Sequence, residues 1–277
     1  TVSAGRIREV LELDLSIKDP VEPKKISKNH RGKIEFKNVS FSYENAEDKV
    51  LDKINFIAQS GQTTAFIGAT GSGKSTLINL IPRFYDVTEG QILVDDIDIR
   101  DLSMHDLRSI IGYVPQKGIL FSGDIESNLR YGDKNAKDDE LKQAAKIAQS
   151  IEFIESQEEK FKSLVSQGGN NFSGGQKQRL SIARALVKKA PIYIFDDSFS
   201  ALDFKTDVAL RYALKKYTSH STVLIVAQRV STIMHSDQIV VLNEGKVVGI
   251  GTHKELLKTC EEYKEIAMSQ LSKEELG

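Results

Sequence analysis

A glycine-rich run carries the clearest chemistry in the sequence. It reads GATGSGKST and consists of Gly68, Ala69, Thr70, Gly71, Ser72, Gly73, Lys74, Ser75 and Thr76. The run fits the pattern GxxxxGK[ST] and lies between a predicted strand and a predicted helix, the context that gives this pattern meaning. Glycines let successive backbone N–H groups turn around an anion, and the helix N-terminus adds partial positive charge there. The sequence therefore predicts a phosphate-binding loop, in which Lys74 reaches the β- and γ-phosphates of a nucleotide and Ser75 ligates Mg²⁺.

An acidic pair follows an apolar run later in the chain. Residues 192–195 read as a buried strand, and Asp196 and Asp197 come directly after it. An acid at the carboxyl end of a strand in a parallel sheet lies beside a phosphate loop. We therefore expect Asp196 to hold the magnesium through water, because this ion gives up its hydration shell reluctantly.

Strands alternate with helices along the chain, which predicts a mostly parallel sheet covered on both faces. The predicted strands cover residues 33–41, 54–57, 63–67, 192–195, 222–227 and 238–242. The predicted helices cover residues 74–81, 138–148 and 176–187, with one or two amphipathic helices over 253–271. Residues 1–31 combine a short helical pattern with a polar stretch that holds prolines and lysines, which indicates a linker entering a domain.

The composition limits the possible functions. With 38 Lys and Arg against 39 Asp and Glu, the 277-residue chain has a formal net charge of -1, so it lacks the basic excess that nucleic-acid binding uses. Its 40% hydrophobic and 28% charged residues are typical of a globular protein and exclude disorder throughout. No apolar run approaches the roughly 18 residues of a membrane span, so the chain is expected to be soluble as given. Cys260 is the one cysteine, which fits a reducing compartment, and the start at Thr1 suggests a segment of a longer protein.

A third motif, in residues 172–176, brings the others together. Just before a predicted helix, the run FSGGQ resembles the signature motif of ATP-binding cassette (ABC) proteins, and the resemblance extends over nearly all of residues 32–271. In this family, the helix N-terminus formed by Ser173, Gly174, Gly175 and Gln176 grips the γ-phosphate bound to the opposite subunit. The resemblance implies an α/β fold of the P-loop NTPase ABC ATPase type over residues 32–272. This fold has a mostly parallel core sheet, an antiparallel β subdomain and a helical subdomain at about 117–178.

Further positions match the family one at a time. Tyr43 resembles the aromatic residue that stacks on adenine. Gln116 resembles the residue that touches Mg²⁺ or the attacking water and that connects to the helical subdomain. Residues 200–203 resemble the loop that crosses the dimer interface. The resemblance thus implies ATP and Mg²⁺ as cofactors and a second ABC nucleotide-binding domain that meets this one head to tail.

Other segments resemble exporters that fuse a transmembrane domain to the cassette. They are residues 83–86, 120–123 and 251–257, and residues 3–13 look like the helical tail that links the last membrane helix to the cassette. The implied place is the cytoplasmic face of the cell membrane, with the chain's own transmembrane domain lying outside this sequence and no nucleic acid as partner.

Two departures from the family pattern bear on catalysis. Hydrolytic members carry a glutamate after the metal-binding aspartate, and this chain has Asp197, whose carboxylate is one methylene shorter. Where the family's switch histidine is expected, the chain has Gln228, which can donate a hydrogen bond but cannot carry a positive charge. None of the five histidines takes its place: His220 precedes the strand, and polar surroundings indicate a solvated surface role for His30, His105, His235 and His253.

Both departures affect the same nucleotide, whereas the signature is intact. This combination resembles the degenerate half of a heterodimeric exporter, which binds ATP but turns over its own ATP slowly and completes the site of its partner. A self-sufficient homodimeric transport ATPase is the first alternative. A soluble cassette protein that acts on nucleic acid or ribosomes is the second, and the near-neutral charge argues against it.

Overall fold

A six-stranded sheet forms the centre of the molecule, with the strand order β12-β11-β3-β10-β9-β6. The structure is a computed structural model that describes residues 2–12, 16–27, 31–44, 46 and 48–272. The strands are β3 (Thr63–Ile67), β6 (Ile111–Val114), β9 (Ile192–Asp196), β10 (Thr222–Val226), β11 (Gln238–Asn243) and β12 (Lys246–Gly251). All neighbours pair in parallel except β12, which runs antiparallel to β11. Strands β9 and β10 are buried along their whole length, which explains their continuous apolar sequences.

A second, antiparallel sheet has the strand order β2-β1-β4-β5. Its strands are β1 (Ile34–Phe41), β2 (Leu51–Ala58), β4 (Glu89–Val94) and β5 (Ile97–Asp98). The inner face of this sheet shares a core with α2 (Lys74–Leu80) and with one face of the central sheet. In that core, Phe36 of β1, Leu77 of α2 and Leu224 of β10 are each no more than 2% exposed. A 3₁₀ turn at Ile99–Asp101 and helix α3 (Met104–Ser109) lead from this sheet to β6.

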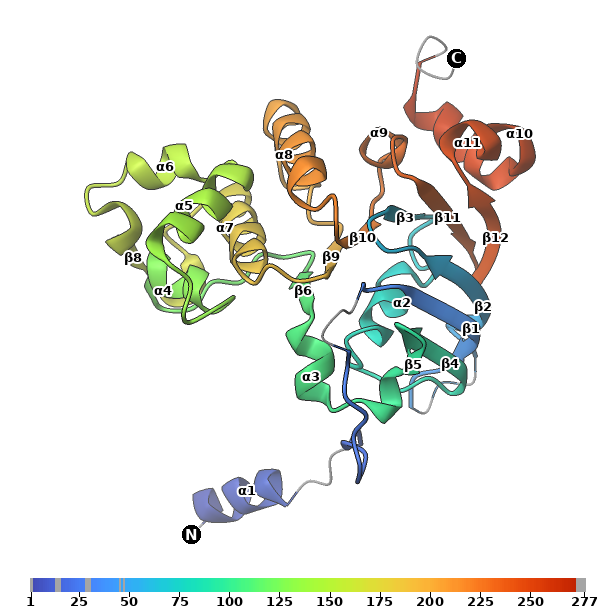
Figure 1. Ribbon diagram of the computed structural model, residues 1–277, viewed down its shortest axis with the longest axis horizontal. Coiled ribbons are helices and arrows are strands. Elements are labelled where there is room, and N and C mark those ends of the chain that lie inside the picture. The colour runs from blue at the N-terminus through green and yellow to red at the C-terminus, as the bar shows by residue number, and fades with distance from the viewer. Residues whose placement is uncertain (1, 13–15, 28–30, 45, 47, 273–277) are drawn as a thin grey trace.

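A helical region stands beside the sheets and is visible at the left of Figure 1. Its elements are α4 (Ile125–Arg130), α5 (Asp138–Ile147), α6 (Ile151–Glu155), α7 (Gly174–Val187), the short pair β7 (Gly123–Asp124) and β8 (Leu164–Val165), and 3₁₀ turns at Lys160–Lys162 and Gln167–Gly169. Helix α7 packs against α4, α5 and β6, so it joins this region to the central sheet. Its buried residues Leu180, Ile182 and Leu186 belong to the same core as Phe195 of β9.

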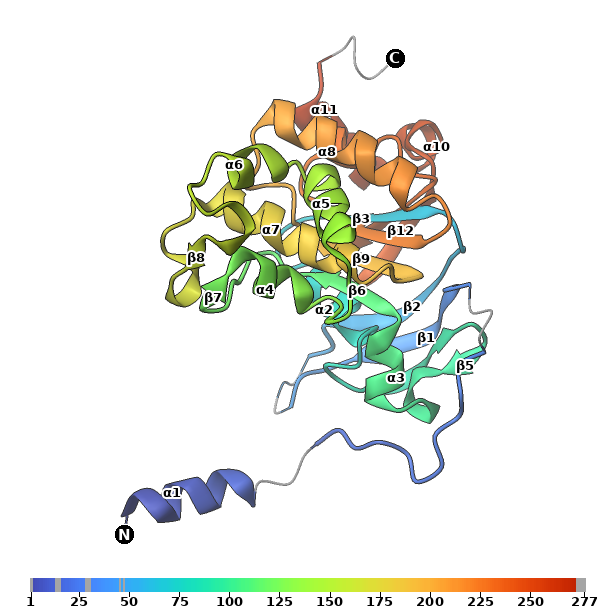
Figure 2. The same ribbon diagram turned by 60° about the vertical axis from the view of Figure 1, so that its left-hand side comes forward.

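The remaining helices complete the molecule. They are α1 (Val2–Leu11), α8 (Phe204–Tyr217), α9 (Val230–Ile233), α10 (His253–Thr259) and α11 (Glu261–Gln270). In Figures 1 and 2, α10 and α11 stand beside β11 and β12, whereas α1 lies apart from both sheets. In the part of the chain that the structure describes, no helix has both the length and the apolar character needed to cross a membrane.

The predicted surface role is wrong for His253. This residue begins α10 and is 7% exposed, and its Nδ1 lies 2.7 Å from the hydroxyl of Tyr263, which is fully buried. Burial lowers the pKa of His253 below its usual value. Polar neighbours in the sequence misled the prediction, because they do not reveal which face of α10 packs under α11. The exposed histidines are His105, His220 and His235, and His30 lies outside the described residues.

Candidate active site

The phosphate-binding loop connects β3 to α2 and depends on glycine at several positions. Gly68, Gly71 and Gly73 have φ values of 154°, 83° and 95°, a region of backbone space that other residues rarely adopt. A Cβ added at Gly68 would lie 2.0 Å from the carbonyl oxygen of Leu242. Gly73 is the N-cap of α2 and has no side-chain partner there. The sequence pattern thus reflects a backbone that turns tightly and leaves the helix N-terminus free for an anion.

The side chain of Lys74 folds back onto the loop that precedes it. Its Nζ donates hydrogen bonds to the carbonyl oxygens of Gly68 at 2.8 Å and Ala69 at 2.7 Å, and it lies 3.3 Å from Ser72 Oγ. Burial lowers the pKa of Lys74, while the charges of Asp197 and Asp196 oppose that shift. The ammonium group therefore stands at the mouth of the loop, close enough to exchange carbonyl partners for phosphate oxygens.

Asp196 and Ser75 form an oxygen pair at the carboxyl end of β9. Ser75 Oγ donates a hydrogen bond of 3.1 Å to Asp196 Oδ1, and Asp196 is 6% exposed. Burial raises the pKa of Asp196, and the bond from Ser75 opposes the shift. A hydroxyl beside a carboxylate is the kind of oxygen set that Mg²⁺ prefers, so these residues fit the ion.

Asp197 receives two amide side chains. Its Oδ2 accepts a 2.9 Å hydrogen bond from Nε2 of Gln228 and a longer one, 3.4 Å, from Nε2 of Gln116. The φ of Asp197 is 42°, a left-handed conformation that is uncommon outside glycine, and its N–H donates to the carbonyl of Val226. Burial raises the pKa of Asp197, although the bond from Gln116 lowers it. Strained backbone of this kind is often concentrated at functional sites.

These side chains surround one cavity of about 300 Å³. It is lined by Val50, Thr70, Gly71, Gly73, Lys74, Ser75, Thr76, Gln116, Asp196, Asp197, Val226 and Gln228. The structure therefore brings together the glycine-rich loop, the acidic pair and the two glutamines, which come from four separate parts of the sequence. Val50 and Val226 were not predicted, because an apolar residue that borders a polar site has no distinguishing sequence signal.

Tyr43 lies next to the loop but does not line this cavity. Its hydroxyl is 3.0 Å from Thr76 Oγ1, and its ring meets those of Phe41 and Tyr85 edge to face, with centroids 4.9 and 5.2 Å away. The ring is held in place from two sides while the residue remains 38% exposed. It is thus positioned beside the nucleotide loop, and its stacking on a base remains a prediction.

The signature residues lie outside the cavity. Ser173 caps α7 by a reciprocal pair of bonds with Gln176: Ser173 Oγ accepts from the Gln176 N–H at 3.2 Å, and Gln176 Oε1 accepts from the Ser173 N–H at 2.9 Å. A Cβ at Gly174 would meet nothing within 4 Å, whereas one at Gly175 would lie 3.3 Å from the Ala201 carbonyl oxygen. The helix start is therefore accessible at Gly174, next to residues 200–203, and is separate from the chain's own phosphate loop.

Comparison with known proteins identifies the class. The sequence profile of the family described as "ABC transporter" matches residues 51–200, which is more than half of the chain, and the chain belongs to this family. Both the predicted family and the predicted ABC ATPase fold, with its parallel and antiparallel sheets, are confirmed. Domains of this family bind ATP, and the family is one of ATPases.

Particular relatives narrow the class. The chain is 45% identical over 272 residues to the uncharacterized ABC transporter ATP-binding protein YfiB of Bacillus subtilis, covering 98% of the chain and 47% of that protein. It is 41% identical over 277 residues to the ATP-dependent lipid A-core flippase of Syntrophus aciditrophicus, covering 99% of the chain and 45% of the flippase. A solved structure of a bacterial Atm1-family ABC exporter with ATP bound matches with a TM-score of 0.92 and 34% identity, over 98% of the chain and 47% of that exporter. The chain thus spans about half the length of the relatives it matches.

Proposed function

We propose that this chain is the ATP-binding cassette of an ABC exporter, that its own hydrolytic site is weakened, and that its intact signature completes the site of a non-identical partner cassette. The observation that carries the proposal is the presence of a short carboxylate, Asp197, and a neutral amide, Gln228, in a site whose other parts are complete. The resemblance to exporters such as the lipid A-core flippase supports a role in export at the cytoplasmic face of the membrane.

Binding of the nucleotide follows from the loop. Its backbone N–H groups and the N-terminus of α2 surround the phosphates, and Lys74 transfers its hydrogen bonds from the loop carbonyls to the β- and γ-phosphates. Ser75 would hold Mg²⁺ directly and Asp196 would hold it through water, and the bound ion would supply positive charge against the phosphates. The ring of Tyr43, fixed through Thr76, covers the base.

Hydrolysis at this site is slow for a geometric reason. A base must reach the water that attacks the γ-phosphate, and phosphoryl transfer depends mostly on positioning. The carboxylate of Asp197 is one methylene short, and one of its oxygens already accepts from Gln228 and Gln116. The Gln228 amide is neutral, so it does not stabilise the charge that develops on the γ-phosphate as an imidazolium would.

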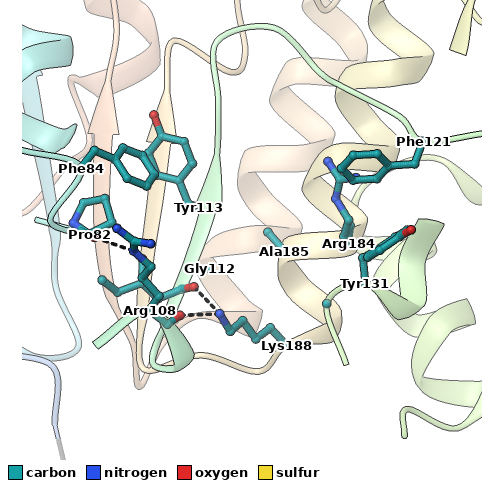
Figure 3. Close-up of a pocket in the computed structure, with 12 residues that line it drawn as sticks. Pro82, Phe84, Arg108, Gly112, Tyr113, Phe121, Tyr131, Arg184, Ala185 and Lys188 are labelled. Atoms are coloured by element: carbon teal, nitrogen blue, oxygen red, sulfur yellow. Dashed lines mark hydrogen bonds between the residues drawn. The ribbon is translucent and has the colours of Figure 1, made fainter. Parts of the chain in front are cut away.

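This chain has a surface that suits a transmembrane partner. A groove of about 290 Å³ runs between the helical region and the sheets, and Figure 3 shows its aromatic lining. On one side Arg108 lies over the ring of Phe84, and on the other Arg184 lies over Phe121. As whole residues, Phe84, Phe121 and Tyr131 are 42%, 48% and 61% exposed. Exposed rings gathered in a groove are typical of protein interaction sites, and we propose that the transmembrane domain docks here.

A self-sufficient homodimer is the second candidate. The 2.9 Å bond between Gln228 and Asp197 favours it, because two departures that contact each other form a matched pair. Robust hydrolysis by the wild-type chain alone, increasing with its concentration, would support this candidate over the first.

Gly174→Asp tests which nucleotide the signature serves. An aspartate at the first position of α7 is compatible with the helix and stabilises it by about 0.5 kcal/mol, yet its charge repels a γ-phosphate. Because a side chain at Gly174 meets open space, we expect the variant to fold normally and to bind ATP at its own loop. ATP turnover at the partner site that this signature completes is expected to fall by at least about 100-fold.

Complementation makes this test specific. Asp197→Glu and Gln228→His return the two residues of the family pattern and so restore the hydrolytic site. A chain that combines them with Gly174→Asp has a restored site but no usable signature, so alone it is expected to be inactive. Mixing it with wild-type chain should restore ATP turnover, measured as phosphate release, since the wild-type signature completes the restored site. Mixing it with the Gly174→Asp single variant is the matched control and should remain inactive. Turnover in that control mixture would contradict the proposed role of the signature.

A further inference from the structure

The last residue of α11, Gln270, forms hydrogen bonds with the loop that carries Gln228. The side-chain amide of Gln270 donates from Nε2 to the carbonyl oxygen of Gln228 at 2.9 Å, and its Oε1 accepts from the N–H of Val230 at 2.8 Å. One side chain therefore bridges the main chain on both sides of Arg229. Sequence reasoning did not single out Gln270, which lies 42 residues from Gln228 in the chain.

The bridged segment is short and firmly held at both of its ends. Before it, the Ala227 N–H donates to the carbonyl of Phe66 in β3, which continues the central sheet. After it, Val230 and Ile233 of α9 are fully buried, and the guanidinium of Arg211 donates to the carbonyl oxygen of Ser231. Gln228 and Arg229 between these anchors are exposed. The bridge from Gln270 therefore acts where packing does not determine the backbone.

The bridge continues into the active site. The main chain of Gln228 that Gln270 holds carries the side chain whose Nε2 donates to Asp197 Oδ2 at 2.9 Å. In addition, α9 has no side-chain cap from its own N-cap residue, Arg229, and Gln270 satisfies the N–H of its first residue instead. A displacement of α11 would thus move Gln228 relative to Asp197.

We propose that Gln270 is a positioning residue for hydrolysis: it fixes the backbone at position 228 so that the side chain there meets the residue at position 197. This inference rests on the proposed function, because it takes positions 197 and 228 as the hydrolytic pair. It adds that helix α11, through Gln270, helps to hold the residues at positions 197 and 228 in contact.

The amide of glutamine meets both demands of the bridge, because it carries a donor and an acceptor. Glutamate at position 270 can accept from Val230 but cannot donate to the Gln228 carbonyl, lysine can donate but cannot accept, and leucine can do neither. The fold does not depend on this contact, since Tyr263 and Ala267 of α11 are fully buried and hold the helix on the core. The variants are therefore expected to keep the melting temperature of the wild-type chain.

The contact is tested first by amide hydrogen exchange at Val230. In wild-type chain this N–H is bonded to Gln270, and in Gln270→Leu and Gln270→Lys it is expected to exchange up to about tenfold faster. Gln270→Glu should retain the protection because its carboxylate still accepts. Met268→Ala, a truncation of an exposed residue in the same turn, is the matched control and should leave the exchange unchanged. Equal exchange in all five proteins would overturn the proposal.

The role is tested by the kinetics of ATP turnover. The Gln270 variants are compared in the wild-type chain and in the Asp197→Glu, Gln228→His chain, and the faster of the two provides the readout. We expect Gln270→Leu to lower kcat by about 3- to 10-fold with KM for ATP unchanged, because the phosphate loop is not touched. Faster exchange at Val230 with unchanged kcat would overturn the positioning role. A restored chain no faster than wild type would count against the proposed function instead, and the effect of Gln270 would then be measured in wild-type chain.

Discussion

Lys74→Ala is expected to weaken nucleotide binding at this site by about 100-fold or more while leaving the protein folded. The ammonium of Lys74 is the cation held against the loop carbonyls of Gly68 and Ala69, and its removal takes away the charge that faces the β- and γ-phosphates. Loss of a charged partner in a desolvated site typically weakens binding by about 100-fold or more. Gly68 is half-buried and Ala69 is exposed, so water can reach the carbonyl groups left behind and their loss of partner costs little stability. Titration of Mg-ATP by calorimetry measures the effect.

Two further variants separate charge from shape. Lys74→Met retains most of the stem and removes the charge, and it should lose binding nearly as fully as the alanine variant. Lys160→Ala, which removes a lysine that is 61% exposed and paired with Glu155 on the surface, should bind like wild type. If Lys74→Met bound ATP with wild-type affinity, the ammonium would not be the group that holds the phosphates.

The local parts of this site could be predicted from the sequence. Strand β3 spans the predicted residues 63–67, because its apolar run ends at glycines that the loop backbone requires. Helix α7 begins at Gly174, two residues before the predicted start, because the reciprocal cap of Ser173 and Gln176 extends it. In both cases the information lies within a few neighbouring residues, so it can be read along the chain.

Contacts between distant segments could not be predicted. The bond between Gln228 and Asp197 follows from parallel pairing of β10 with β9, in which Val226 stands opposite Asp196. The bridge from Gln270 depends on where α11 packs, and neither its residue type nor its spacing signals it. His253 was misjudged for the same reason, because the face of α10 that is buried depends on the position of Tyr263. Tertiary packing decides these features, and hydrophobic periodicity does not encode them.

Asp197→Glu combined with Gln228→His is expected to raise ATP turnover at this site by about 100-fold. The added methylene advances the carboxylate by about 1 Å toward the attacking water. A misplacement of about 1 Å in a reacting group can lower the rate by about 100-fold. The histidine adds a side chain that can carry positive charge beside the γ-phosphate. Phosphate release under saturating Mg-ATP measures the change, for the chain alone and for the chain with its partner.

The single variants show whether the pair acts as a unit. Asp197→Glu alone should recover part of the gain, whereas Gln228→His alone should recover little, because the carboxylate that it faces is still short. Lys74→Ala in the restored chain should remove all turnover, which ties the gain to this nucleotide.

Stability is expected to move in the opposite direction from turnover. Asp197 adopts a φ of 42°, and aspartate tolerates this region better than glutamate does, so the restored chain should be less stable to urea by up to about 1 kcal/mol. A faster enzyme with a lower free energy of unfolding cannot be explained by improved folding, and the gain then belongs to the chemistry of the site. If turnover stays at the wild-type level while stability falls as expected, glutamate has entered the site without becoming a better base. In that case the 2.9 Å pairing of Gln228 with Asp197 would be a working arrangement, and the self-sufficient homodimer would be the better account of this chain.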